Sequence, residues 1–425
     1  MTLHPLARRA ALLLAGLPLC VAAADVPTSF RFDGAGAGVL VAPDAAYERG
    51  KGYGLVAPAA GGELSFTVQA APGDYAVTVT LGAGRGRVAV LAEDRRLMLA
   101  PLAADSAAPV RRSFVVNVRN AALKKVWTDP SAAPRVPIRG EEASGRAWDE
   151  QLTISLAGAA PALQAIEIVP VQARRILLGG DSTVAAQTAG DAASWGQMLS
   201  RFVDPAVAVA NHARSGETLK SFMTNLRWDK LMSDTRPGDV VLLQFGHNDE
   251  KQEYARTYAA ADGAYTGFLT AFVSDVRQRG AHPVLLTPVA RRTFNAAGKI
   301  ENSHAGYDDA VRALAAKLAV PLIDLTAMTT RMYETLGPEV SPSAFTNGGK
   351  DKTHHNVYGA YVIACFVARG LAATPALGIK PALDKPVCEP DRFGGPRDYG
   401  LVKSDWPILR AMPSVEPEQS ASDKL

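Results

Sequence analysis

The chain has 425 residues and lacks the features that mark several broad classes of protein. No charge of one sign dominates, with 45 Lys and Arg against 42 Asp and Glu, which argues against a nucleic-acid or membrane-surface binder. Beyond the first 24 residues, no apolar run approaches the roughly 18 residues needed to span a bilayer. We therefore expect a mature protein without a membrane anchor and without nucleic acid as a partner.

Two ligand-binding motifs are also missing. The pair "GD…GHND" superficially resembles metallophosphoesterase blocks, but no Asp-x-His precedes Gly180 and no later Gly-His-x-His follows. The stretch "DGAGAGV" at residues 33–39 resembles a dinucleotide loop, but no βαβ pattern surrounds it, so it is interpreted as a glycine-rich turn. We expect no metal and no cofactor.

The first 24 residues are typical of a secretory signal. Arg8 and Arg9 precede the apolar stretch "AALLLAGLPLCVA", and three alanines then offer a cleavage site. Residues 1–24 are therefore predicted to be a signal peptide, and the protein to be periplasmic or secreted. In an oxidising compartment Cys365 and Cys388 could form a disulfide; the alternative is that Cys365 is a buried small apolar residue.

Residues 25–171 alternate apolar and polar side chains with period two. The stretches "ELSFTVQA" and "DYAVTVTLG" show this pattern, separated by turns rich in Gly, Pro and Asp. Many short strands of this kind predict an antiparallel β-sandwich. It could bind sugar through aromatics such as Tyr47, Tyr53 and Trp127, or it could only buttress the rest of the chain.

Residues 172–380 follow a different pattern. Continuous apolar runs such as "RILLGG", "AVAVAN" and "DVVLLQFG" alternate with segments of helical length. Strands that are apolar on both faces indicate a parallel sheet covered by helices on each side, which places this region in the α/β class. Residues 381–425 are rich in Pro and Gly and are predicted to be an irregular tail.

Polar residues follow the predicted strands, where ligands bind in open parallel sheets. Ser182 follows the first strand, Gly216 lies in "HARSGETLKS", Asn248 in "GHNDEK", and Asp351 with His354 in "DKTHHN". This set contains a hydroxyl, an imidazole that could take its proton, and a carboxylate that could orient the imidazole. The other interpretation of Ser182 is a plain helix N-cap.

In an acyl transfer by this serine, negative charge would develop on the carbonyl oxygen. This oxyanion needs hydrogen-bond donors that are fixed in advance. The backbone N–H groups of Ser182 and Gly216 and the side-chain amide of Asn248 are the candidates. Asp181 and His247 are expected to support these groups by hydrogen bonding rather than to react.

The four blocks "GDST", "ARSGET", "GHND" and "DKTH", in this order, resemble the GDSL, or SGNH, hydrolase superfamily. Residues 175–371 further resemble its rhamnogalacturonan acetylesterases, and the preceding domain resembles the galactose-binding-like accessory β-sandwich of bacterial members. The resemblance implies a flavodoxin-like three-layer α/β/α domain and a serine esterase that forms an acetyl-enzyme. It also implies the triad Ser182, His354 and Asp351, with Gly216 and Asn248 as oxyanion donors.

The implied substrate is an acetylated pectic polysaccharide or oligosaccharide. Its galacturonate carboxylates would suit guanidinium groups, for which Arg214, Arg291 and Arg292 are candidates. An acetylxylan esterase or another SGNH deacetylase is the alternative activity, and a non-catalytic carbohydrate-binding protein is the alternative of another class. His355 is expected at the rim or bonded to a loop. Two further histidines are expected to be ordinary surface or loop residues: His212 and His304.

Overall fold

The computed structural model describes most of the chain after residue 27. The described residues are 28–34, 36–56, 64–82, 87–103, 108–123, 133–158, 163–188, 190–382 and 388–396. The predicted signal peptide and Trp127 lie outside these ranges. Within them, no helix is both long enough and apolar enough to cross a membrane.

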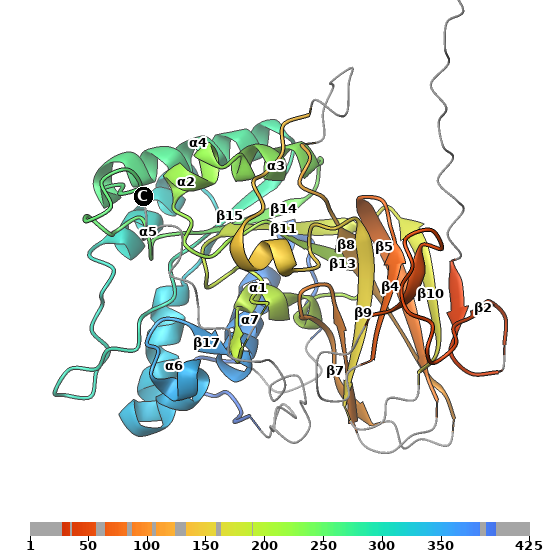
Figure 1. The fold of residues 1–425 in the computed structure, drawn as a ribbon. Helices are drawn as coiled ribbons and strands as arrows, with labels where there is room; N and C mark the ends of the chain where they lie inside the picture. The colour runs from red at the N-terminus through yellow and green to blue at the C-terminus, as the bar shows by residue number, and fades with distance from the viewer. Residues whose placement is uncertain are drawn as a thin grey trace, which may run out of the picture.

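The N-terminal region forms two five-stranded sheets (Figure 1). One has the order β2 (Val39–Leu40), β1 (Ser29–Arg31), β10 (Leu163–Val171), β5 (Gly73–Leu81) and β8 (Val110–Val118). The other has the order β3 (Tyr53–Val56), β4 (Leu64–Gln69), β9 (Gln151–Gly158), β6 (Arg87–Ala92) and β7 (Arg96–Ala103). The strands pair antiparallel as predicted, except that β1 and β2 are parallel.

A parallel sheet follows in the second region. Its order is β13 (Val207–Asn211), β11 (Arg174–Gly180), β14 (Val240–Gln244), β15 (His282–Leu286) and β16 (Leu322–Ile323). In chain order this is 2-1-3-4-5, the flavodoxin-like arrangement. The predicted α/β class and its strands are confirmed.

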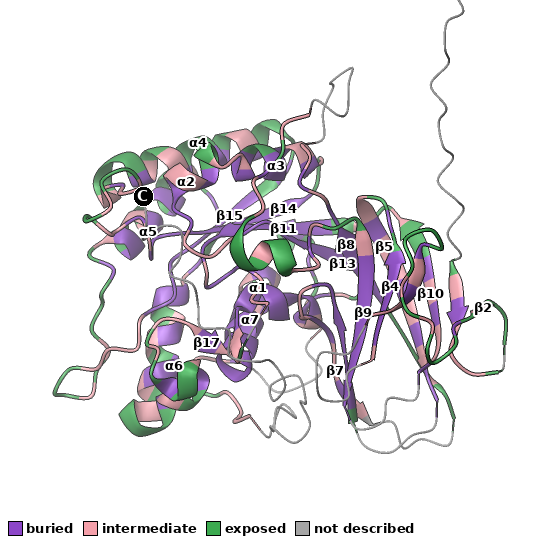
Figure 2. Ribbon diagram, viewed as in Figure 1, coloured by how far each residue is buried: buried purple, intermediate pink, exposed green. Residues whose placement is uncertain are grey.

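Helices cover both faces of this sheet (Figure 1). One face carries α2 (Leu219–Thr224), α3 (Arg227–Asp234), α4 (Thr266–Gln278) and α5 (Tyr307–Leu318). The other carries α1 (Trp195–Met198), α6 (Leu325–Val340) and α7 (Val357–Ala372). Strand β11 shows why its sequence is continuously apolar, because Ile176 and Leu178 enter one core and Leu177 the other. The central strands are accordingly buried along most of their length, with exposed residues only at the first positions of β11, β15 and β16 (Figure 2).

Short elements complete the described fold. A two-stranded sheet pairs β12 (Ala192–Ala193) with β17 (His355–Asn356). The 3-10 helices are η2 (Gly140–Ser144), η3 (Leu199–Phe202), η5 (Ser341–Ala344), η6 (Asn347–Gly349) and η7 (Pro375–Leu377), and η4 (Ala261–Tyr265) is a π-helical turn.

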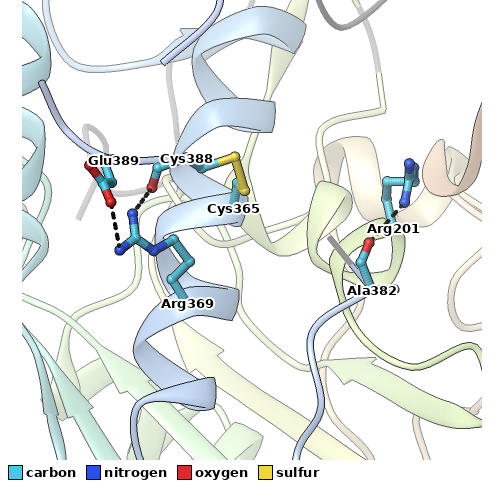
Figure 3. The surroundings of a disulfide bond; sticks show 6 residues. All are labelled: Arg201, Cys365, Arg369, Ala382, Cys388 and Glu389. Atoms are coloured by element: carbon cyan, nitrogen blue, oxygen red, sulfur yellow. Dashed lines mark hydrogen bonds and ion pairs between the residues drawn. A yellow bond between two sulfur atoms is a disulfide. The ribbon is translucent and has the colours of Figure 1, made fainter. Parts of the chain in front are cut away.

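The described part of the tail is fastened to the α/β region. Cys365 in α7 forms a disulfide with Cys388, and Arg369, one helical turn later, donates to the Cys388 carbonyl at 2.9 Å (Figure 3). Arg201 donates to the carbonyl of Ala382 at 3.3 Å. Of the two interpretations of Cys365, the structure supports the bridge. The described residues after 380 form only turns and isolated bridges, in line with the predicted irregular tail.

Candidate active site

Three side chains from distant parts of the chain form one hydrogen-bonded series. Ser182, just after β11, lies with its Oγ 2.9 Å from His354 Nε2, and His354 Nδ1 lies 2.9 Å from Asp351 Oδ2. Close packing fixes the turn before the serine, because a Cβ on Gly180 would approach Val184 Cγ2 to 2.6 Å. The β12–β17 pairing, which begins one residue after His354, joins the two loops. The structure therefore brings the three predicted residues together.

Asp351 determines the orientation of the imidazole. Its Oδ1 accepts the backbone N–H groups of Thr353 at 2.6 Å and His354 at 2.8 Å, which leaves Oδ2 for His354 Nδ1. Partial burial alone would raise the pKa of Asp351, but the hydrogen bonds from His354 and Thr353 outweigh it and hold that pKa well below its usual range. Because an ionised carboxylate only accepts, Nδ1 carries the proton and Nε2 is free to accept from Ser182.

The predicted oxyanion donors lie in neighbouring loops. Gly216, after β13, has φ +80°, a left-handed conformation that favours glycine. The Asn248 side-chain amide donates to the Glu217 carbonyl at 3.1 Å and keeps a second hydrogen. Among the described residues, none accepts a hydrogen bond from the backbone N–H of Ser182 or Gly216. The geometry leaves all three groups able to donate to a ligand.

Residues 179–360 match the GDSL-like Lipase/Acylhydrolase family. The chain is 38% identical over 215 residues to rhamnogalacturonan acetylesterase RhgT of Bacillus subtilis, covering 48% of this chain and 90% of that protein. It is 33% identical over 204 residues to the probable rhamnogalacturonan acetylesterase YesY of the same organism, covering 47% of this chain and 93% of that protein. This chain belongs to the GDSL-like lipase/acylhydrolase family. It is accordingly a carboxylic ester hydrolase.

A solved structure spans more of the chain. The crystal structure of the Bacillus subtilis protein YXIM covers 82% of this chain and 98% of its own, with 25% identity and a TM-score of 0.47.

Behind the serine of this GDSL-like domain, Asp181 and His247 form a buried pair. Asp181 Oδ1 accepts the backbone N–H of Thr183 at 2.9 Å, and its Oδ2 lies 3.2 Å from His247 Nδ1. Burial would raise the pKa of Asp181, but attraction to His247 and these hydrogen bonds lower it. The other ring nitrogen of His247 lies 3.0 Å from the Val289 carbonyl. Both side chains are thus committed to loop contacts, as a supporting role requires.

The three candidate arginines all have internal partners. Arg214 pairs with Glu142 and Glu217, and Arg291 pairs with Glu250. Arg292 donates to the Asp351 carbonyl at 3.4 Å and also to the Gly349 carbonyl. The guanidinium of Arg292 therefore braces the loop that carries the carboxylate.

His212 and His304 were expected as surface or loop histidines. Both lie in loops, but neither is at the surface, because they are 1% and 0% exposed. His304 lies between Glu250 and the Val289 carbonyl, and His212 packs edge-on against Trp148 of the sandwich region. Neither burial follows from the local sequence, because both depend on neighbours far along the chain.

His355 is also buried, so a rim position is excluded. Its Nε2 lies 2.6 Å from the Tyr333 hydroxyl, and burial lowers its pKa to about 3. The neutral ring packs against Phe345 and holds β17 in place. The structure thus assigns different positions to the two adjacent histidines, with His354 facing the serine.

Several residues around the site were missed by the sequence analysis. Asp249 is fully buried and accepts the backbone N–H groups of Leu219 and Gly246, and burial raises its pKa to about 7. Gln187 donates to the Ser182 carbonyl at 2.8 Å. The position of Asp249 directly after Asn248 was the only sequence signal available.

Metal-ligating side chains do not gather in the part of the chain that is described. No group of three or more His, Cys, Asp or Glu there could hold a metal ion.

Proposed function

We propose that this protein is a serine carbohydrate esterase that removes acetyl groups from plant cell-wall polysaccharide, with rhamnogalacturonan as its substrate. The observation that carries the proposal is the hydrogen-bonded series Ser182–His354–Asp351. The relatives named as rhamnogalacturonan acetylesterases support the substrate. The His354 side chain is 41% exposed, so a polymer-borne acetyl group could reach it from solvent.

In the first half of the proposed reaction, Ser182 Oγ attacks the acetyl carbonyl carbon while His354 Nε2 takes the hydroxyl proton. The negative charge that develops on the carbonyl oxygen is stabilised by the N–H groups of Ser182 and Gly216 and by the Asn248 amide. Collapse of the intermediate breaks the bond to the sugar oxygen. His354 returns its proton to that oxygen, and the acetyl group stays on Ser182.

In the second half, water attacks the acetyl-enzyme. His354 takes a proton from the water, the same donors stabilise the second oxyanion, and acetate leaves as Ser182 regains its proton. Asp351 remains ionised throughout, because its depressed pKa reflects hydrogen bonds that favour the carboxylate. Its role is to orient the ring and stabilise the imidazolium.

For recognition of galacturonate carboxylates we propose Arg214 and Arg291. Each keeps 21% of its side chain exposed despite its internal ion pair, so donors remain for a ligand. Arg292 is better accounted for by its bonds to the Asp351 loop.

Export to the periplasm or the exterior is also part of this proposal. The predicted signal lies in residues 1–24, and the disulfide between Cys365 and Cys388 supports an oxidising compartment.

The proposal is tested by measuring acetate release from acetylated rhamnogalacturonan and, in parallel, from acetylated xylan. We expect preference for the pectic polymer, no loss of activity with EDTA, and loss of turnover in Ser182→Ala. Ser274→Ala, an exposed serine on α4, is the matched control and should behave as wild type. Full activity of Ser182→Ala would contradict the mechanism, whereas preference for xylan would contradict only the substrate.

A further inference from the structure

The sandwich contributes side chains to a hydrophobic core of the GDSL-like domain. Strand β6 alternates its side chains between two environments: Val88 and Val90 enter the sandwich core, and Ala89 and Leu91 join the core that contains α1 and α7. The edge strand β8 also reaches across, where the backbone N–H of Val115 donates to the Pro205 carbonyl at 2.9 Å. The sandwich therefore contacts the hydrolase through buried side chains as well as through the backbone.

One acidic side chain of the sandwich region extends into the loops of the active site. Glu142 lies in η2, the short helix between β8 and β9. Its Oε2 accepts from Arg227 NH2 and lies 3.3 Å from Arg214 Nε. Arg214 lies two residues before Gly216, so this contact reaches the loop of a proposed oxyanion donor.

A second acidic residue completes the network. Glu217 Oε1 lies 3.3 Å from Arg214 NH1 and 3.5 Å from Arg227 Nε. Both Arg227 and Glu217 are only 1% exposed. Two arginines are thus balanced by two carboxylates, and neutralising Glu142 would leave positive charge in surroundings that solvate it poorly.

This network includes residues next to the proposed oxyanion donors. Gly216 lies between Arg214 and Glu217 along the chain. The ion pairs of these two residues therefore hold the backbone on both sides of the Gly216 N–H. The Glu217 carbonyl also accepts from the Asn248 amide. A shift of Glu217 would therefore displace two of the three donors at once.

A separate sandwich contact steadies the loop after the serine. Arg95, between β6 and β7, donates to the carbonyls of Gly190 at 3.2 Å and Ala192 at 3.3 Å. It also reaches the Gln187 carbonyl at 3.4 Å, and the Gln187 side chain donates to the Ser182 carbonyl. The sandwich therefore contacts loops of the site through two separate side chains, Glu142 and Arg95.

We propose that Glu142 is a positioning residue of the esterase, which holds Gly216 and Asn248 through Arg214, Arg227 and Glu217. The sandwich is then part of the catalytic unit and not a separable sugar-binding module. This inference rests on the proposed function, because it assigns Glu142 to the oxyanion side of that reaction.

The test compares Glu142→Gln with Glu141→Gln in the full chain. Both changes remove one negative charge from η2 and keep the side-chain size, but Glu141 is exposed and has only a 3.4 Å contact with Thr188. The substrate is 4-nitrophenyl acetate, which has no sugar to bind. We expect Glu142→Gln to lower kcat at least about tenfold with KM within about twofold, since misplaced donors weaken the transition state and not ground-state binding. Glu141→Gln should match wild type.

The outcomes separate this inference from the proposed function. A wild-type protein without activity on the ester would overturn both. This inference alone would be overturned if the wild type is active and the kcat of Glu142→Gln stays within twofold of it. A change in Glu142→Gln that is confined to KM would have the same consequence. If Glu142→Gln melts below the assay temperature, Glu142→Asp, which keeps the charge but shortens its reach, takes its place, and the same limits on kcat and KM apply.

Discussion

Replacing Asp351 with Asn tests the proposed chemistry at its most constrained point. In the native site, Oδ1 of Asp351 accepts two backbone N–H groups and Oδ2 faces His354 Nδ1. The single oxygen of an asparagine would stay with the two backbone donors, since turning it away would leave both unpaired at about 1–3 kcal/mol each. Its NH2 group would then point at His354 Nδ1.

That arrangement reverses the tautomer of the imidazole. Nδ1 would have to accept from the asparagine amide, so the proton would lie on Nε2, directed at Ser182 Oγ. A protonated Nε2 cannot take the serine proton, and the wrong tautomer in a triad of this kind costs about 10⁴ in kcat, or roughly 5.5 kcal/mol of transition-state stabilisation. Substrate contacts are unchanged, so KM should change little.

The assay is kcat and KM for acetate release by Asp351→Asn, together with the thermal midpoint of both proteins. Asp309→Asn is the matched control, because Asp309 is 77% exposed and lies on α5, outside the proposed catalytic set. A folded Asp351→Asn protein with kcat within about tenfold of wild type would refute the assignment of the tautomer to Asp351.

Two further predictions concern stability. The Cys365–Cys388 bridge spans a sequence separation of 23 residues, so the chain-entropy model predicts that Cys388→Ala costs about 3 kcal/mol and lowers the calorimetric midpoint; an unchanged midpoint would contradict this. Burial raises the pKa of Asp249 to about 7, so the folded chain keeps a proton that the unfolded chain releases between about pH 4 and pH 7. Stability should fall as pH rises through this window, by at most about 1.4 kcal/mol per pH unit from this group. The difference in thermal midpoint between wild type and Asp249→Asn should therefore change between pH 5 and pH 8, and a constant difference would argue against the assignment.

The fold was largely predictable from the period of the apolar residues. Alternation predicted the sandwich and continuous apolar runs predicted the parallel sheet, because each pattern reports how many faces of a strand are buried. Strand β6 lies between these cases, since "RVAVLA" is buried on both faces although it belongs to an antiparallel sheet. Its second face joins the core that contains α1 and α7, a partner that no local pattern could name.

The candidate site residues were predictable for a different reason. Ser182, Asn248, Asp351 and His354 combine rare chemistry with positions at strand ends, so their residue types limit their roles. The residues that hold them carry no such signal. Glu142 and Glu217 are ordinary acidic residues of polar loops, which usually face solvent, and only the folded chain shows that Glu217 is buried against two arginines.

The two sides of the site are consequently supported in different ways. The series Ser182–His354–Asp351 is held by backbone N–H groups, close glycine packing and the β12–β17 pairing, all within the α/β region. The proposed oxyanion donors lie beside a charge network that one carboxylate of the sandwich completes. Under the proposed mechanism, the domain boundary predicted at residue 171 is a change of strand pattern and not a functional boundary. Proton transfer would be organised on one side of it and oxyanion stabilisation on both.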